Sequence, residues 1–424
     1  MSAAIPEQMG SGPRVGYLEL LRRNRNFRQI WLGQVVSQMG DWFNTIALYS
    51  IVLTLTGSGR AVGLVLVARF LPTVFMGSLS GVIADRYNRR TIMIVSDLLR
   101  AVIVLGFLFI RRPDQVWLIY VLTVLQLICS SFFEPAKTAA IPSVVEKREL
   151  LAANAISSVT WSSMLTLGAA IGGVITGAFG TNAAFVLDSV TYLVSAALIV
   201  TVQLPKRPAR AKSKLTICKA LGITDTFEGI RYVTQRPRVF ALLLVKSAWG
   251  LGGGILALLA VFGERIFPIR GSGATGIGVL YAARGIGTAI GPIAARRFAG
   301  ETQQSMQTAI GIAFFMGGIF YIGFGMSTNF ALALAMLVVA HSGGSILWVN
   351  STVLLQHAVE DNFRGRVFAA DFALLTLTMA ISNYATGELL DRFGFSPRAV
   401  TIGIGVLFLM PAILWFLTKR WWNT

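Results

Sequence analysis

Charged side chains are scarce in this sequence of 424 residues. Only 13% of the residues are Asp, Glu, Lys or Arg, whereas soluble domains carry about a quarter. The few charges are also unbalanced, with 37 Lys and Arg against 19 Asp and Glu, which gives a formal net charge of +18. Basic nucleic-acid-binding domains are rich in charge, so this scarcity argues against nucleic acid as the partner.

Cysteine and histidine are scarce as well. Cys129 and Cys218 fit no metal-binding or redox spacing, and two cysteines cannot form a disulfide framework. His341 and His357 are too few for a metal cage, so we expect no metal and no other cofactor. A cleavable signal peptide is also not visible, because the apolar run that follows the polar first 26 residues is too long for one.

Apolar residues make up 54% of the chain and form long runs. A helix of about 20 apolar residues spans a bilayer, whereas strands of a membrane barrel need only ~10 alternating residues. Since backbone groups in hydrocarbon must satisfy one another, we predict an all-α integral membrane protein. Twelve spans are expected, at 27–55, 61–84, 91–110, 116–136, 152–178, 183–203, 239–262, 274–294, 305–326, 330–350, 367–390 and 398–417.

The polar segments between these runs predict the domain organisation. We expect two six-helix bundles over 27–204 and 239–418, joined by a basic cytoplasmic linker over 205–238. Residues 1–26 are predicted to hold a basic amphipathic helix on the membrane surface, and 419–424 a cytoplasmic tail. With the N-terminus in the cytoplasm, that side of the membrane holds 26 Lys and Arg against seven on the other side. The positive-inside rule therefore places both termini in the cytoplasm.

The two predicted bundles resemble each other in sequence. Gly63-Leu-Val-Leu-Val-Ala-Arg69 aligns with Gly278-Val-Leu-Tyr-Ala-Ala-Arg284, and Val145-Glu146 aligns with Val359-Glu360 at nearly the same offset. Two repeated bundles with binding sites between them at mid-membrane are typical of secondary transporters.

The segment between the second and third spans reads Gly81-Val-Ile-Ala-Asp85-Arg-Tyr-Asn88-Arg-Arg90. It resembles the G-x-x-x-D-R-x-G-R-R signature loop of the major facilitator superfamily, with Asn88 in place of a glycine. Because Asn tolerates the left-handed backbone conformation, we expect the turn to be kept. The resemblance implies the major facilitator fold, with twelve transmembrane helices in two pseudo-symmetric six-helix bundles.

The same resemblance implies that this loop stabilises one conformational state. Gly81 permits close helix packing, and Asp85 accepts hydrogen bonds from the N-terminus of the eleventh span near Arg364–Phe368. Three basic residues are expected to pair with carboxylates or anionic lipid: Arg86, Arg89 and Arg90. An ordinary positive-inside loop is the alternative. The corresponding segment of the second half, 295–300, lacks the aspartate.

Further segments narrow the resemblance to one branch of the superfamily. They are similar to enterobactin-type siderophore exporters and macrolide efflux pumps, and partly to bacterial lysophospholipid transporters. These segments are Ser37–Phe43, Leu53–Ser58, Phe133–Lys137, Leu151–Ala155 and Phe185–Asp188.

Charges inside the predicted spans are candidate functional groups, because each costs on the order of 3 kcal/mol unless it has a partner or faces a cavity. Asp41 and Arg69 lie at similar predicted depths. We interpret Asp41 as a site for a proton or a cationic substrate that Arg69 tunes, and a purely structural ion pair is the alternative. Asp97 and Arg100, one turn apart, are expected to pair with each other.

The second half is predicted to be more cationic. Arg284 repeats Arg69, and Lys246 adds a further cation, so anionic or zwitterionic head groups are expected to dock there. The alternative for Lys246 is that its side chain extends to the membrane interface. Asp188 and Asp371 are further candidate proton sites.

Glycines mark candidate packing and hinge positions. Gly168-Ala-Ala-Ile-Gly172-Gly173 resembles the antiporter motif G-P-x-x-G-G, with alanine in place of the proline. Gly291-Pro292 is predicted to pack closely and to kink the eighth span. Gly253, in a run of three glycines, is a candidate hinge in the seventh span. Generic helix packing is the alternative for all of them.

We therefore expect a secondary transporter, not an enzyme, that exports an amphipathic small molecule of the drug or siderophore class by alternating access and proton antiport. The alternative is a lysophospholipid transporter or flippase. The expected partners are the small-molecule or lipid-like substrate, protons, and membrane lipids that include anionic lipid at the cytoplasmic face. We expect a monomer in a bacterial cytoplasmic membrane.

Overall fold

The computed structural model describes residues 16–205, 231–298 and 302–418. Within these residues the chain is almost entirely helical, and its only pairing of extended backbone is an isolated bridge between Ile269 and Ser272. The predicted linker lies outside the described residues over 206–230, and so does the predicted tail, 419–424.

The first half begins with a short helix, α1 (Tyr17–Arg23), where a surface helix was predicted over 17–26. Leu20 is buried, and Asn24 ends α1 and caps the next helix by accepting a hydrogen bond from the Phe27 amide at 3.0 Å. The bundle consists of α2 (Arg25–Thr56), α3 (Gly59–Arg86), α4 (Arg89–Leu105), α5 (Val116–Val144) and α6 (Leu150–Val200).

Helix α6 contains two of the predicted spans. Its backbone is interrupted at Gly180, which has φ 84° and ψ 168°. A side chain would be strained there, so glycine lets the chain reverse without a loop. The sequence predicts separate spans over 152–178 and 183–203, and the structure joins them through this single residue.

The second half consists of α9 (Pro237–Gly250), α10 (Ile255–Val261), α11 (Gly273–Phe298), α12 (Gln303–Met326), α13 (Phe330–Ala358), α14 (Asp361–Asp391) and α15 (Pro397–Thr418). Helices α9 and α10 are two parts of one span, separated by a turn over 251–254 that contains the three consecutive glycines.

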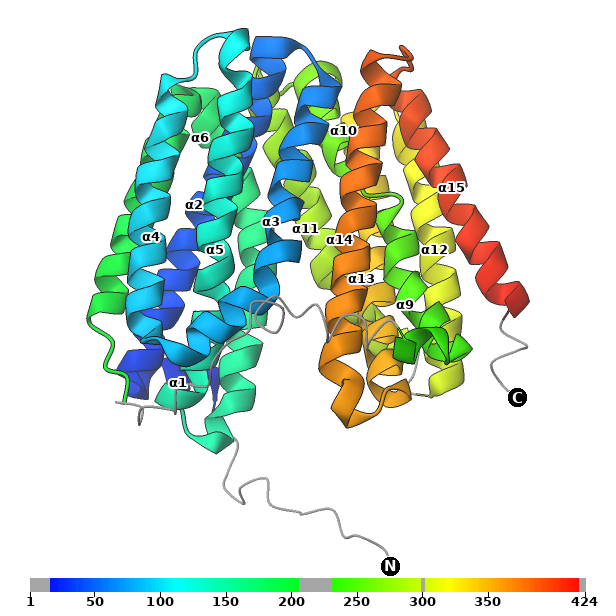
Figure 1. Ribbon diagram of the computed structural model, residues 1–424. Helices are drawn as coiled ribbons and strands as arrows, with labels where there is room; N and C mark the ends of the chain where they lie inside the picture. Colours follow the sequence, from blue (N-terminus) through cyan, green and yellow to red (C-terminus); the bar gives the residue numbers. More distant parts are fainter. Residues whose placement is uncertain (1–15, 206–230, 299–301, 419–424) are drawn as a thin grey trace, which may run out of the picture.

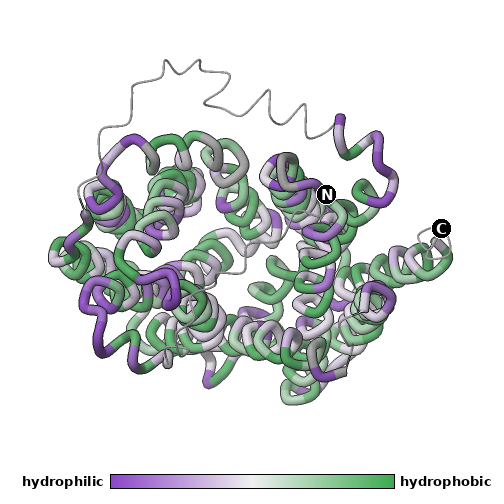
Figure 2. Tube along the Cα trace, turned by 90° about the horizontal axis from the view of Figure 1, so that it is seen from below, coloured by the Kyte–Doolittle hydropathy of each residue, from purple (hydrophilic) through white to green (hydrophobic). Residues whose placement is uncertain are grey.

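Nine helical segments among the described residues are long and apolar enough to cross a membrane. One of them, Lys147–Val200, crosses twice because of the reversal at Gly180. Helices α2 and α3 add two more crossings, with lengths of 32 and 28 residues. The total is twelve, which confirms the predicted fold class. Hydrophobic residues follow the helices, and hydrophilic ones gather mainly where helices end (Figure 2).

The two bundles lie side by side (Figure 1). Helix α2 begins and α15 ends at the same end of the molecule, which we call the terminal end, and we call the opposite end the distal end. The bundles meet at the distal end and are separated at the terminal end (Figure 1).

Candidate functional site

A chain of buried hydrogen bonds runs through the first bundle. Asn44 on α2 donates to the Gln126 amide oxygen at 3.1 Å and to the Asp188 carboxylate at 2.9 Å. Gln126 in turn donates to the Tyr192 hydroxyl at 2.9 Å, and that hydroxyl donates to Asp41. The chain therefore connects two carboxylates, one half-buried and one fully buried, through neutral groups from α2, α5 and α6.

A buried ion pair lies beside this chain. Asp97 and Arg100 on α4 pair with each other, as predicted, and Ser195 donates to Asp97 at 2.7 Å. The Arg100 guanidinium lies 4.3 Å from the centre of the Tyr192 ring and 4.7 Å from that of Phe133. These rings lie within cation–π distance, so the cation is held by one carboxylate and two aromatic faces.

The hydrogen-bonded chain and the ion pair beside it hold more acid than base, although Lys137 and Arg89 are also buried elsewhere in the first bundle. Three carboxyl groups, Asp41, Asp97 and Asp188, share this interior with the single guanidinium of Arg100. Among the described residues, no Lys or Arg forms an ion pair with Asp41 or Asp188. A buried charge without an opposite partner is unfavourable in a low dielectric, and binding a proton removes it. The arrangement is suited to taking up protons.

Arg69 does not pair with Asp41 in the described structure. Arg69 of α3 and Arg284 of α11 instead lie close enough to the Tyr281 hydroxyl to interact with it electrostatically. The Arg284 guanidinium is 5.8 Å from the centre of the Tyr281 ring, and its Nε atom is buried without a hydrogen-bond partner. The two arginines that the sequence repeat aligns therefore lie near one tyrosine.

Tyr281 also contacts the first bundle through aromatic rings. Its ring centre lies 5.9 Å from that of Trp42 and 5.7 Å from that of Tyr49, both on α2. Trp42 directly follows Asp41 in sequence. The aromatic contact therefore joins the acidic interior of the first bundle to the cationic side of the second.

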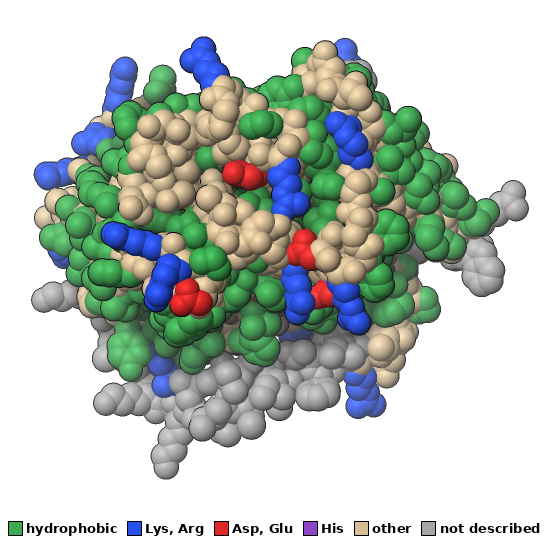
Figure 3. Space-filling model, turned by 90° about the horizontal axis from the view of Figure 1, so that it is seen from above, with side chains coloured by type: hydrophobic (Ala, Val, Ile, Leu, Met, Phe, Trp, Pro, Cys, Tyr) green, Lys and Arg blue, Asp and Glu red, His purple; other side chains and the backbone are tan. Residues whose placement is uncertain are grey.

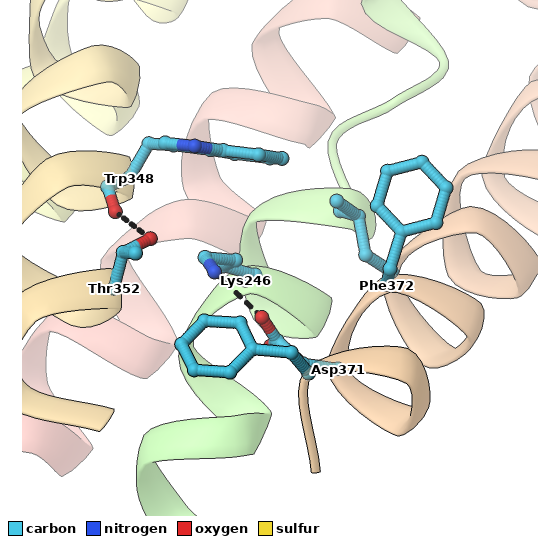
Figure 4. Close-up of a pocket in the computed structure, with 7 residues that line it drawn as sticks. Lys246, Trp348, Thr352, Asp371 and Phe372 are labelled. Carbon is cyan, nitrogen blue, oxygen red and sulfur yellow. Dashed lines mark hydrogen bonds and ion pairs between the residues drawn. The ribbon is translucent and has the colours of Figure 1, made fainter. Parts of the chain in front are cut away.

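Lys246 and Asp371 form a buried ion pair in the second bundle, with 2.5 Å between Nζ and Oδ2. The sequence identified both residues but did not predict that they pair. They line a cavity of about 180 Å³ between α9, α13 and α14, together with Trp348 and Phe372 (Figure 4). Lys246 therefore does not extend to the membrane interface in this structure, because its side chain is buried against Asp371.

An aspartate at the end of α14 closes the distal end of the molecule. Asp391 accepts hydrogen bonds from the Ser58 hydroxyl at 2.5 Å, the Gly59 amide at 3.1 Å and the Arg60 amide at 2.7 Å. These groups form the N-terminus of α3, where the helix dipole favours a negative charge. Arg60 also forms an ion pair with Glu388 at 2.9 Å. We call these five residues the distal gate.

The space-filling view of the distal end shows acidic side chains beside basic ones over the middle of the face (Figure 3). The distal gate was missed from sequence, although its signal is present. Gly387-Glu-Leu-Leu-Asp391-Arg392-Phe-Gly394 repeats the G-x-x-x-D-R-x-G spacing of the Gly81 loop. The segment that corresponds to the Gly81 loop in the second half, 295–300, lacks the aspartate, and the repeated spacing lies instead at the C-terminal end of α14.

Small residues allow the bundles to touch at the distal end. A Cβ atom on Gly173 of α6 would lie 2.8 Å from Cα of Gly278 on α11, so nothing larger than glycine fits without a shift. Thr275 of α11 donates to the Gly173 carbonyl at 3.3 Å. The other two glycines of the predicted antiporter motif, Gly168 and Gly172, pack instead on Trp42 and Phe43 within the first bundle.

Contacts at the terminal end differ from this. A Cβ atom on Gly81 near the end of α3, or on Gly365 near the start of α14, would meet no atom within 4 Å. The close packing predicted at Gly81 is therefore absent from this arrangement. Asp85 is the second-last residue of α3, and its side chain lies outside the described part.

The basic residues of the Gly81 loop are tied to their own bundle. Arg89 donates to the Ala139 carbonyl and to the Ser143 hydroxyl on α5, and Arg90 donates to the Val200 carbonyl at the end of α6. Arg86, the last residue of α3, is exposed.

The prediction of a left-handed backbone conformation at Asn88 is wrong. Asn88 has φ −66°, and its side chain caps α4 by accepting from the Arg90 amide at 3.0 Å and the Thr91 amide at 3.4 Å. Asparagine is favoured here as an N-cap, so the residue replaces the usual glycine for a different reason.

The remaining predicted packing residues lie within the second bundle. A Cβ atom on Gly253, at the break between α9 and α10, would lie 3.0 Å from Cα of Met379 on α14. Gly291 packs against Ser342 and Ser345 of α13, and Pro292 lies inside α11. Taken together, the contacts describe two bundles that are closed at the distal end and open toward the terminal end.

Known proteins share both the sequence pattern and the fold. The family described as transmembrane secretion effector matches residues 20–423. An uncharacterised MFS-type transporter of Bacillus subtilis, YfiS, is 24% identical over 416 residues, which covers 95% of each chain. Macrolide efflux protein A of Streptococcus pyogenes is 24% identical over 378 residues, covering 87% of this chain and 90% of that one.

A solved structure has the same overall arrangement. It is a bacterial homologue of the human lysosomal transporter Spinster in an inward-facing, occupied conformation, with a TM-score of 0.72 and 16% identity. The match covers 97% of this chain and 98% of that one. At this identity the similarity shows the fold.

Proposed function

Because this chain belongs to the transmembrane secretion effectors of the major facilitator superfamily, which are membrane transporters, we propose that it exports an amphipathic small molecule by alternating access in exchange for protons. The observation that carries the proton part is the buried chain of hydrogen bonds that joins Asp41 to Asp188, neither of which forms an ion pair with a described Lys or Arg. The efflux part is supported by the named activity of macrolide efflux protein A.

The proposal places the terminal end in the cytoplasm of a bacterial cell. The support is the distribution of Lys and Arg, with 26 on the side of the termini against seven on the other. In this orientation the structure is inward-facing, and the distal gate separates the central site from the outside. Cargo then enters from the cytoplasm or the inner leaflet.

In the outward-facing state the distal gate opens and the Gly81 loop closes the other end. Asp85 then caps the start of α14, as Asp391 caps the start of α3 in the inward-facing state. Helices α3 and α14 run antiparallel (Figure 1), and each carries an aspartate near its C-terminal end, Asp85 on α3 and Asp391 on α14.

Asp41 and Asp188 are the proposed proton carriers. A proton that enters the buried chain can bind either carboxylate, and the hydroxyl of Tyr192 and the amides of Gln126 and Asn44 connect the two. Asp41 is half-buried beside Trp42, which contacts Tyr281 across the bundles, so its protonation state is coupled to the interface that must rearrange.

The test is proton movement in liposomes that contain the purified protein and a pH-sensitive dye. Macrolides, siderophores and lysophospholipids are added in turn. We expect one of the first two classes to move protons, and Asp41→Asn to abolish this movement while the protein still reaches the membrane. Asp114→Asn, in an exposed loop, is the matched control.

Two results would overturn the proposal. Unaltered proton-coupled export by Asp41→Asn and by Asp188→Asn would remove the acidic chain from coupling. Lysophospholipid movement between leaflets without any proton movement would favour the flippase alternative.

A further inference from the structure

The cavity of the second bundle has the size of a single ring. Its volume is about 180 Å³, and it is lined by the Lys246–Asp371 pair, three aromatic rings and Leu375. An engineered apolar cavity of about 150 Å³ holds one benzene molecule. The cavity therefore fits one ring of a larger molecule.

The walls are aromatic on two sides of the ion pair. Trp348 of α13 and Phe372 of α14 point into the cavity from opposite sides (Figure 4), and their exposed fractions are 45% and 48%. Aromatic faces left open in this way bind other rings through stacking and apolar burial. Lys246 Nζ lies 4.9 Å from the Trp348 ring centre and 5.6 Å from that of Phe368, so the cation is covered by these rings.

The ion pair leaves one strong acceptor unused. Asp371 is 2% exposed, and its Oδ2 atom pairs with Lys246, whereas its Oδ1 atom is buried and has no hydrogen-bond partner among the described residues. A buried acceptor without a donor is unfavourable, and a donor supplied by a ligand removes that penalty.

The charges of the pair cancel, and this decides which ligand fits. A cationic amine would be repelled by Lys246, and an anion would be repelled by Asp371. Either would leave a net charge in a site that is largely removed from water. An uncharged donor leaves the pair balanced.

We propose that this cavity is a subsite for an uncharged ring of the cargo that carries a hydroxyl or amide N–H donor. The ring lies between Trp348 and Phe372, and the donor binds Asp371 Oδ1. The inference rests on the proposed function, since it names the part of the exported molecule that the second bundle recognises.

The test uses a thiol placed at the cavity rim. Thr352 is half-buried, lines the cavity and donates its hydroxyl to the Trp348 carbonyl at 2.7 Å. Thr352→Cys is made in a background with Cys129→Ser and Cys218→Ser, and maleimide labelling is timed in liposomes. Three compounds with the same ring compete: N-acetylphenylalaninamide is neutral, phenylalaninamide is a cation and N-acetylphenylalanine is an anion.

We expect the neutral compound to slow labelling at concentrations at least about tenfold lower than either charged compound. Thr328→Cys, in the loop between α12 and α13, is the control position, where none of the compounds should change labelling.

Two neutral substitutions then test the role of the pair. In Asp371→Asn the lysine is left uncompensated, so the anion becomes the best competitor. In Lys246→Gln the aspartate is left uncompensated, so the cation becomes the best. The double variant restores the preference for the neutral compound, and because it buries no charge it also controls for folding.

The proposal is overturned if no compound slows labelling of the protein that keeps both Lys246 and Asp371. It is also overturned if the three compounds rank in the same order of potency in that protein, in both single variants and in the double variant. If the single variants do not fold, the test is whether the neutral compound is the best competitor both with the intact Lys246–Asp371 pair and in the double variant. The labelling experiment does not depend on transport, so it tests the subsite separately from the proposed function. If the neutral compound protects Thr352→Cys but the protein exports nothing, the proposed function is wrong and the subsite stands. If the protein exports cargo but the three compounds protect equally, the subsite is wrong and the proposed function stands.

Discussion

The two bundles share a fold but differ in how they bury charge. In the first bundle, hydroxyl and amide groups link Asp41 to Asp188, and the Asp97–Arg100 ion pair lies beside this chain with Arg100 against the Tyr192 ring. In the second, Lys246 and Asp371 neutralise each other, and Arg284 forms no ion pair with a described carboxylate. This difference is the basis of our proposal that the first bundle binds the exchanged protons and the second recognises the cargo.

The largest difference in stability is expected inside the first bundle, where the buried residues Asp97 and Asp188 have different partners. Asp97→Asn leaves Arg100 buried without its carboxylate, and breaking a buried ion pair in this way costs about 3–5 kcal/mol. Asp188→Asn removes a charge that has no cationic partner, so we expect unfolding in detergent to shift little while proton-coupled transport is lost. Thermal unfolding of both variants, beside the transport assay, measures this. Equal destabilisation by the two substitutions would contradict the proposed division between a structural and a proton-binding aspartate.

A smaller change in free energy is expected at the distal gate, where Asp391 of α14 caps the N-terminus of α3. Asp391→Ala removes the acceptor of three donors at the start of α3, and loss of a helix cap costs about 1–2 kcal/mol. The distal end should therefore open about 5–30 times more often. Labelling of Thr275→Cys from the distal side, in the cysteine-free background, reports this opening.

Arg60→Gln is the matched control for the distal gate. It keeps the backbone amide that Asp391 accepts from but removes the ion pair with Glu388, in which the arginine side chain is 50% exposed, and the contact with the Tyr384 ring. Exposed ion pairs contribute about 0.2–1 kcal/mol. If this variant opened the distal end as much as Asp391→Ala does, the helix cap would not be the main contact.

The smallest change in stability is expected at Arg284, which forms no ion pair with a described carboxylate. Arg284→Gln breaks no ion pair in the described structure and removes a buried Nε atom that lacks a partner. We expect the free energy of unfolding to change by less than about 1 kcal/mol, or to rise. Arg100→Gln serves as the contrasting variant, because it leaves Asp97 unpaired and should destabilise the protein strongly. A large loss of stability in Arg284→Gln would show that this arginine has a structural role.

The fold was predictable because membrane helices are specified by local composition. Every predicted span is helical, although 239–262 is divided into α9 and α10. Most ends differ by a few residues, but α5 continues to Val144 instead of 136, and α14 begins at Asp361 instead of 367. The break between 152–178 and 183–203 was predicted, but its tightness was not. Thr181 and Asn182 suggest a polar loop after Gly180, whereas in the structure both residues are already helical.

The candidate site was predictable residue by residue but not as a set of contacts. Apolar runs interrupted by charge identified Asp41, Asp188, Lys246 and Asp371, since such charges are rare in membrane helices. Which of them pair depends on residues far apart in sequence, such as Lys246 and Asp371 on different helices. The role of Asn88 was misjudged because the same side chain suits both a left-handed turn and an N-cap.

The repeated Gly-x-x-x-Asp-Arg spacing on α3 and α14 has a thermodynamic consequence. If Asp85 caps α14 in the outward-facing state, as proposed above, closing one end while opening the other exchanges one set of contacts for a similar set. The two states then differ little in free energy, and neither is a deep minimum in which the protein would be trapped. Differential binding of a proton or a cargo molecule worth a few kcal/mol is enough to reverse their populations. Weakening either cap alone should therefore slow turnover by favouring one state, whereas weakening both should restore part of it.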